Sequence, residues 1–205
     1  MSNFDFQTDY ILENDYVRLS PLKEEHIHKL LDISKEKDIW KYSFIKGDGL
    51  QNLTNYIKNT IQNRTDNKEY PFVVFDKIHN EYAGSTRLYD FILPFDSIRV
   101  GYTWYGDKYR GTLLNKNVKY LLFEFLFEKN QFNRIGLGAY IENKRSISAM
   151  KSVGCKQEGI VRELLPSPTS EKHKSDAIMF SILKSDWMTS VKENLKTKTS
   201  TQQSV

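Results

Sequence analysis

The sequence predicts a mixed α/β fold of the α+β type, with a mostly antiparallel, twisted sheet of six to seven strands and helices on both faces. Three strand-like runs, at 70–76, 82–91 and 98–105, follow one another before a long helix, which is typical of an antiparallel meander. After the helix the chain returns to a strand. A strand–helix–strand unit makes its two strands parallel, with a right-handed crossover.

The helix of this unit has five apolar residues at the i, i+3, i+4, i+7 and i+8 spacing of an amphipathic helix, which are Val118, Leu121, Leu122, Phe125 and Leu126. It begins near residues 110–115, directly after strand 98–105. Backbone N–H groups at a helix start lack intrahelical partners and carry partial positive charge. This junction therefore predicts an anion-binding site, for which phosphate is the usual ligand. An ordinary surface joint between strand and helix is the alternative.

The other elements follow from the same two periodicities. Strands are expected at 16–20, 134–140, 159–164 and 178–183, and helices at 24–34, 50–61 and 143–153. Asn143 is suited to cap the last of these helices, and Gly154 to end it. Gly84 and Gly101 lie inside strands, where glycine marks a bulge or a close backbone approach. We expect one domain over 1–188 and a polar, disordered tail over 189–205.

The composition is that of a globular protein, with 39% hydrophobic residues in 205. The net charge is +4, and the tail supplies half of it, so we expect no nucleic-acid partner. No apolar run has membrane-spanning length, and the first residues are unlike a signal peptide. The single cysteine cannot form an internal disulfide. We expect a cytoplasmic protein without a membrane partner and without a metal.

Two segments carry a more specific signal when they are taken together. One is Arg110-Gly-Thr-Leu-Leu-Asn115, and the other is Asn143-x-x-Ser146-x-x-Ala149 followed by Gly154. The pair resembles the GNAT superfamily of acyl-CoA-dependent N-acetyltransferases, and among them the RimJ/RimL-type branch. The family's phosphate loop reads Gln/Arg-x-x-Gly-x-Gly/Ala. Arg110 matches it, whereas Leu113 and Asn115 stand at the glycine positions.

The resemblance implies a parallel strand pair that splays apart near Trp104 and Leu137, with acetyl-CoA in the gap. Backbone groups of Thr103, Trp104 and Tyr105 would pair with the pantetheine arm, as an added strand does. The pyrophosphate would lie on the loop formed by Arg110, Gly111, Thr112, Leu113, Leu114 and Asn115. Asn143 would reach the pantetheine, and Ser146 would approach the sulfur.

The implied reaction is direct attack of an amine on the thioester, which needs no protein nucleophile. In relatives a tyrosine protonates the leaving thiolate, and Met150 stands at its place here. We expect Ser146 to substitute as a hydrogen-bond donor to sulfur; its alternative role is local helix capping. The general base stays open between Glu142, Asp90 and a water chain from Tyr102. We expect Cys155 to be a buried, inert thiol.

We therefore predict an acetyl-CoA-dependent N-acetyltransferase that acts on a primary amine, either a protein N-terminus or a small amine. The alternatives are a catalytically weak CoA-binding module of the same fold and a nucleotide-binding α/β domain. Residues 40–49, 87–96 and 166–174 would shape the acceptor site. Trp40, Tyr42 and Phe44 are expected to fill the core rather than to wall a pocket. Exposed aromatic side chains would also allow a homodimer.

Overall fold

An eight-stranded mixed sheet runs through the molecule in the order β1-β2-β3-β4-β5-β6-β8-β7. The structure is a computed structural model that describes residues 2–43, 45–170 and 173–200. The strands are β1 (Leu12–Glu13), β2 (Val17–Pro21), β3 (Glu69–Asp76), β4 (Glu81–Ile92), β5 (Ser97–Tyr105), β6 (Arg134–Tyr140), β7 (Lys156–Pro166) and β8 (Lys174–Leu183). All neighbours pair antiparallel except β5 and β6, which are parallel.

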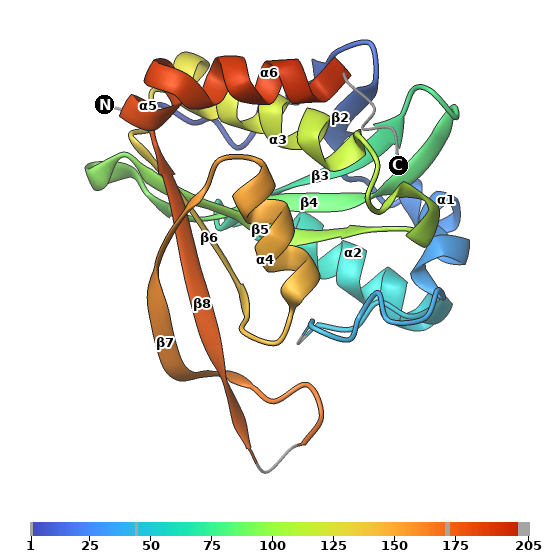
Figure 1. Ribbon diagram of the computed structural model, residues 1–205. Coiled ribbons are helices and arrows are strands. Elements are labelled where there is room, and N and C mark those ends of the chain that lie inside the picture. The colour runs from blue at the N-terminus through green and yellow to red at the C-terminus, as the bar shows by residue number, and fades with distance from the viewer. Residues whose placement is uncertain (1, 44, 171–172, 201–205) are drawn as a thin grey trace.

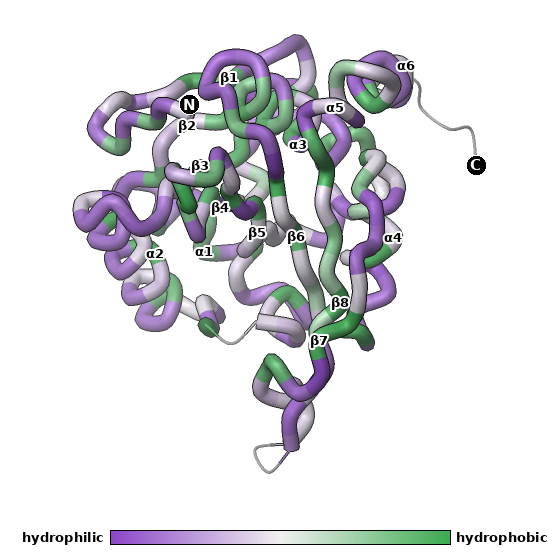
Figure 2. The backbone as a smooth tube through the Cα atoms, turned by 90° about the vertical axis from the view of Figure 1, so that its left-hand side faces the viewer, coloured by the Kyte–Doolittle hydropathy of each residue, from purple (hydrophilic) through white to green (hydrophobic). Residues whose placement is uncertain are grey.

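Helices cover both faces of this sheet (Figure 1). They are α1 (His26–Ser34), α2 (Gly49–Thr65), α3 (Leu114–Glu124), α4 (Lys144–Ser152), α5 (Lys184–Asp186) and α6 (Lys192–Ser200). Figure 2 shows α1 and α2 on one side, and α4, α5 and α6 on the other. Each face has its own core, one containing Leu122 on α3 and Met150 on α4, the other containing Leu53 on α2. None of the helices in the described ranges combines the length and the apolar character needed to cross a bilayer.

The predicted fold class is confirmed, but the predicted number of strands is wrong. The additional strand is β1, which has two residues and pairs with β2 through Leu12↔Leu19 and Glu13↔Arg18. Two residues are too few to show an alternation of apolar and polar side chains, so the sequence gives no signal for it. The strands do not alternate with helices from the start of the chain, which a doubly wound nucleotide-binding domain would require.

The predicted disorder of the tail is also wrong as far as Ser200. A π-helical turn, Trp187–Val191, leads into α6, and the side chains of Val191, Leu195 and Thr199 are buried. These residues are spaced by four, so they form one narrow stripe on an otherwise polar helix, which packs against α3. Residues 201–205 lie outside the described residues.

Strands β5 and β6 pair over only part of their length. The parallel pairs are Ser97↔Arg134, Ile98↔Ile135 and Arg99↔Gly136. Beyond them β5 continues to Tyr105 and β6 to Tyr140, while β6 stays paired with β8 along its other edge. The two strands therefore separate at their carboxyl ends, as the resemblance implied.

Strands β4 and β5 approach each other unusually closely near the gap. Gly84 on β4 has φ +153°, and a Cβ atom there would lie 2.0 Å from the carbonyl oxygen of Trp104. Only glycine leaves this space open, which confirms the expected close backbone approach.

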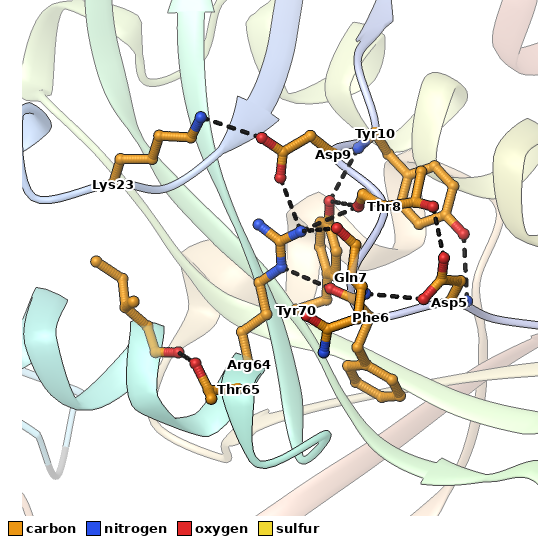
Figure 3. Close-up of polar contacts among 11 residues, drawn as sticks. Asp5, Phe6, Gln7, Thr8, Asp9, Tyr10, Lys23, Arg64, Thr65 and Tyr70 are labelled. Carbon is orange, nitrogen blue, oxygen red and sulfur yellow. Dashed lines mark hydrogen bonds and ion pairs between the residues drawn. The ribbon is translucent and has the colours of Figure 1, made fainter.

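The N-terminal segment is fastened across β3 and α2 by Arg64 and Tyr70, and Figure 3 shows residues 5–10 folded around these two side chains. Arg64 Nε donates to the Phe6 carbonyl at 2.8 Å, and its Nη2 contacts Asp9 Oδ1 at 2.8 Å. Tyr70 Oη donates to the Thr8 carbonyl at 2.7 Å. These contacts hold the segment whose phenylalanines pack against β4.

Replacing Arg64 by alanine should lower the free energy of unfolding by about 1–3 kcal/mol, because several charge-assisted hydrogen bonds are lost at once. Urea denaturation measures the change. Lys58→Ala is the matched control on the same helix. The Lys58 side chain is 55% exposed and 3.6 Å from Glu24, and its loss should cost less than about 0.5 kcal/mol. Equal losses in the two variants would contradict this interpretation.

Candidate active site

A cleft of about 750 Å³ opens where β5 and β6 separate, and we call it the splay cleft. One end is bordered by β5, β6, the start of α3 and α4, and the other end by α2, β3 and β4. It brings together most of the predicted cofactor residues, which are Thr103, Trp104, Tyr105, Arg110, Gly111, Asn115, Asn143 and Ser146. Thr112, Leu113, Leu114 and Glu142 are not among its lining residues.

A bulge in β5 shapes the middle of the splay cleft. Tyr102 and Thr103 together stand opposite the single residue Thr86 of β4, and Tyr102 has φ +48°. Such a conformation is rare for a bulky residue and re-aims the side chains around it. Thr103 faces α3, and Trp104 packs with the core under α1 and α2. The bulge therefore distributes successive side chains of one strand to the two sides of the sheet.

The edge of β5 that faces β6 has no strand partner beyond Arg99 in the described chain. Backbone groups on this edge can therefore pair with an extended ligand, which is the requirement for adding a strand. One of them is already engaged, since Arg110 Nε donates to the Tyr105 carbonyl at 3.3 Å.

The start of α3 supplies unpaired amides at the mouth of the splay cleft. The Leu114 N–H donates to Thr112 Oγ1 at 3.2 Å, and the Asn117 N–H to the Leu113 carbonyl at 3.0 Å. The N–H groups of Asn115 and Lys116 have no acceptor within the described part of the chain. This is the exposed positive end of a helix dipole, which favours an anion.

The loop before α3 differs from the family pattern without obstructing this mouth. Gly111 has φ +75°, and a Cβ atom there would meet nothing within 4 Å. Leu113 has ordinary helical angles, φ −69° and ψ −14°, and Leu114 is buried in the core. Neither Leu113 nor Leu114 is among the residues that line the cleft.

Two arginines meet at the mouth. Arg110 forms an ion pair with Asp107, and Arg145, in the first turn of α4, lines the same cleft. Burial, and then the positive charge of Arg110, lower the pKa of Arg145. Guanidinium groups are suited to contact carboxylate and phosphate oxygens through paired N–H groups. The sequence analysis missed Arg145, although it stands between Asn143 and Ser146 in the recognised segment.

Helix α4 positions Ser146 through its own cap. The Asn143 side chain accepts the Ser146 N–H at 3.1 Å, which confirms Asn143 as the N-cap. Met150 is buried one turn further along. Glu142, in contrast, is exposed, and its contact with the site is through its carbonyl, which accepts from Tyr42 Oη at 3.3 Å.

The far end of the splay cleft combines carboxylates with aromatic rings. Glu69 accepts from Arg87 Nη1 at 2.9 Å, and the Arg87 guanidinium lies 4.2 Å from the ring centre of Tyr56 and 4.7 Å from that of Tyr102. Asp90 lines this end and lies 3.6 Å from Arg99. Each of these carboxylates is thus paired with an arginine, and the rings of Tyr56 and Tyr102 already lie against Arg87, so a cationic amine would share these partners.

The predicted acceptor segments are present only in part. Trp40 and Tyr42 line the cleft, and so do Tyr89 and Asp90, whereas none of the described residues of 166–174 does. The cleft is lined instead by Leu164 and Leu165, which belong to β7 just before that loop. Trp40 is buried in the core and also lines the cleft, so it fills the core and walls the pocket at the same time. Phe44 lies outside the described residues.

The helix α3 contributes a lysine that the sequence analysis did not consider. Lys119 lines the splay cleft, is buried, and donates from Nζ to Thr103 Oγ1 at 3.0 Å. Across the described ranges there is no group of three or more His, Cys, Asp or Glu side chains arranged to hold a metal ion. The polar chemistry of the cleft therefore comes from amides, hydroxyls, carboxylates and these cationic side chains.

The fold and the cleft together define a class, that of mixed α/β proteins with an anion-accepting gap between two splayed parallel strands. The acetyltransferase (GNAT) domain family matches residues 17–156. The chain therefore belongs to the GNAT acetyltransferase family. A search of curated proteins finds no match.

Solved structures share this fold at low sequence identity. A GCN5-related N-acetyltransferase from Brucella melitensis superimposes with a TM-score of 0.85 at 21% identity, over 96% of this chain and 88% of its own. A GNAT-family acetyltransferase from Bacillus anthracis gives 0.73 at 14%, over 86% and 99%. A ribosomal-protein-S5-alanine acetyltransferase from Vibrio fischeri gives 0.68 at 17%, over 87% and 99%.

Cys155 is a buried free thiol, as expected, and burial raises its pKa to about 12. At pH 8 only about one molecule in 10,000 would carry the thiolate, which is the reactive form. Alkylation by iodoacetamide at pH 8 should therefore be at least ~100-fold slower in the native protein than in urea. Mass spectrometry follows the labelling. Comparable rates would show that this thiol is accessible and ionised.

Proposed function

We propose that this protein is an acetyl-CoA-dependent N-acetyltransferase that moves the acetyl group to a primary amine by direct attack in a ternary complex. The observation that carries the proposal is that an unpaired strand edge and a helix start with free amides lie next to each other. The unpaired edge of β5 begins where its pairing with β6 ends, and the free amides of α3 follow directly after that edge. An extended ligand with an anionic end fits this arrangement, and acetyl-CoA is such a ligand.

The residues at the mouth suit the diphosphate. Arg110 and Arg145 provide charge, the amides of Asn115 and Lys116 provide hydrogen bonds, and Gly111 leaves room for a close approach. The backbone of Thr103, Trp104 and Tyr105 would pair with the pantetheine, with Asn143 near it. Thr112, Leu113 and Leu114 would take part only through their backbones.

When bound, acetyl-CoA supplies an acetyl group that is activated as a thioester. The chain's part is to hold the amine in line with it, to remove a proton from the amine, and to donate a hydrogen bond to the carbonyl oxygen as that oxygen gains charge. A backbone N–H near Trp104 is the proposed oxyanion donor. Asp90 has the better placed carboxylate, because it lines the cleft and Glu142 does not. Glu142 stays a candidate base, and Ser146 the predicted donor to sulfur.

The acceptor class that we favour is a protein N-terminus, as in the RimJ/RimL-type branch. The support is the fold shared with proteins named ribosomal-protein acetyltransferases. A small amine is the second candidate, because carboxylates and aromatic rings line the far end of the cleft. A cytoplasmic location and a homodimer stay predictions.

The test has two arms. A thermal-shift titration with acetyl-CoA should raise the melting temperature in proportion to RT ln(1 + [L]/Kd). A thiol-release assay with peptides of different N-termini and with small amines should then find an acceptor. Binding without release on any amine would favour the alternative, a catalytically weak CoA-binding module. The absence of a thermal shift would refute the proposal.

Arg145→Ala should weaken acetyl-CoA binding by about 3- to 10-fold and reduce its salt dependence, because one charge–phosphate contact is lost. The matched control is Lys151→Ala, which removes an exposed charge from the same helix. Its affinity should equal that of the wild type at each salt concentration, as measured by thermal shift. If both variants lose the same affinity, the effect is general electrostatics and not a contact of Arg145.

Leu113→Gly restores the family's glycine and tests whether the departure from the pattern matters. Because Leu113 already has helical angles and its side chain does not line the cleft, the affinity for acetyl-CoA should change less than ~2-fold. A clear gain in affinity or turnover would mean that leucine obstructs the phosphate loop, as the binding-module alternative requires.

A further inference from the structure

Lys119 is a buried amine that lines the splay cleft. Its side chain comes from the middle of α3, and the residue is 5% exposed. The hydrogen bond of its Nζ is to Thr103 Oγ1 at 3.0 Å, and Thr103 in turn contacts Thr86 Oγ1 at 2.7 Å. Within the described chain no carboxylate pairs with Lys119.

Such a lysine is costly for folding. Burial lowers the pKa of Lys119 to about 8. The electrostatic effect of Cys155, just before β7, opposes this lowering. The folded state therefore holds the proton less tightly than the unfolded chain does, so the charged amine opposes folding at neutral pH. A methionine of similar length would avoid this penalty. Packing alone therefore does not explain why a lysine occupies this position.

Lys119 shares the splay cleft with Met150, which stands where relatives have the tyrosine that protonates the leaving thiolate. A methionine side chain cannot give up a proton. The Cys155 N–H donates to the Met150 carbonyl at 3.1 Å, and the charge of Lys119 acts on the Cys155 thiol. Lys119 and Met150 thus line one cleft, Lys119 from α3 and Met150 from α4.

We propose that Lys119 is the catalytic acid of this protein, and that its ammonium group stabilises and protonates the thiolate that leaves when the acetyl group is transferred. The inference rests on the proposed function. It also assigns Ser146 a secondary role, because a hydroxyl can donate a hydrogen bond to sulfur but holds no proton that it can transfer near neutral pH.

The proton balance closes without any further reactant. The carbon–sulfur bond breaks with its electron pair going to sulfur, while the carbon–nitrogen bond to the amine forms. Sulfur takes a proton from Lys119 Nζ, which becomes neutral. The acceptor nitrogen loses its proton to the base, and water relays that proton from the base to Lys119, so both groups return to their starting protonation states. Because Lys119 acts only while it is protonated, turnover should fall as the pH rises through about 8.

The decisive measurement uses CoA itself and needs no acceptor. The ultraviolet absorbance of the thiolate gives the pKa of bound CoA, after subtraction of the protein alone. In the wild type this pKa should be lower by about 1 than in Lys119→Met, because a cation beside the sulfur favours the thiolate. Lys129→Met, an exposed lysine in the turn after α3, is the matched control and should equal the wild type. Equal values in the wild type and Lys119→Met would overturn the proposal.

Two further variants separate charge, proton transfer and folding. Lys119→Met should melt at the same temperature as the wild type or higher and should bind CoA, so a loss of turnover is not a loss of fold. Lys119→Arg keeps the charge but does not release a proton. With the acceptor found by thiol release, both variants should lose turnover by at least about 10-fold. Wild-type turnover in Lys119→Arg would overturn proton donation.

These results are distinguishable from a failure of the proposed function. If the wild type shows no thermal shift with CoA or acetyl-CoA, the transferase proposal fails, and this one fails with it. If the wild type binds CoA and Lys119→Met leaves the thiol pKa unchanged, only the role of Lys119 is refuted.

Discussion

The structure depends on the place where β5 stops pairing with β6. Up to Arg99 the two strands satisfy each other's backbone groups, and beyond it they do not. Buried backbone groups without partners are unfavourable, so such an edge is retained only where a ligand or water completes it. On the two sides of this gap β5 stays paired with β4 and β6 with β8, and the helices pack on the two faces of the sheet. The end of the pairing between β5 and β6 thus creates the cleft.

The charges around the cleft are distributed along its length. The mouth has Arg110, Arg145 and the start of α3, and it favours a polyanion. The far end has Glu69 and Asp90, each beside an arginine, with aromatic rings between them. Between the two ends lies Lys119, a buried cationic side chain that donates to Thr103 Oγ1. An anionic ligand would therefore bind at the mouth, whereas the carboxylates of the far end are already paired with arginines.

Local patterns explain which features were predictable. A second apolar face of the α3 region contains Phe123 and Phe127, which are both buried. Lys119 lies on the same face, four residues before Phe123, so this spacing would have indicated a buried lysine. Arg145 was equally visible inside a recognised segment. The fold class followed from the meander and the strand–helix–strand unit, since both depend on contacts close in sequence. The two-residue strand β1 had no pattern to detect.

The sequence by itself determined the order and type of most elements, the glycine at the β4–β5 contact and the two segments that face acetyl-CoA in relatives. Those are properties of short stretches, in which periodicity and backbone preference act locally. Only the tertiary structure decided that Lys119 meets Thr103, that α6 is ordered by burying Val191 and Leu195, and that Glu142 turns away from the cleft while Asp90 faces it. These outcomes depend on burial between elements distant in sequence, and a lysine or a polar helix looks the same in the sequence whether or not another element covers it.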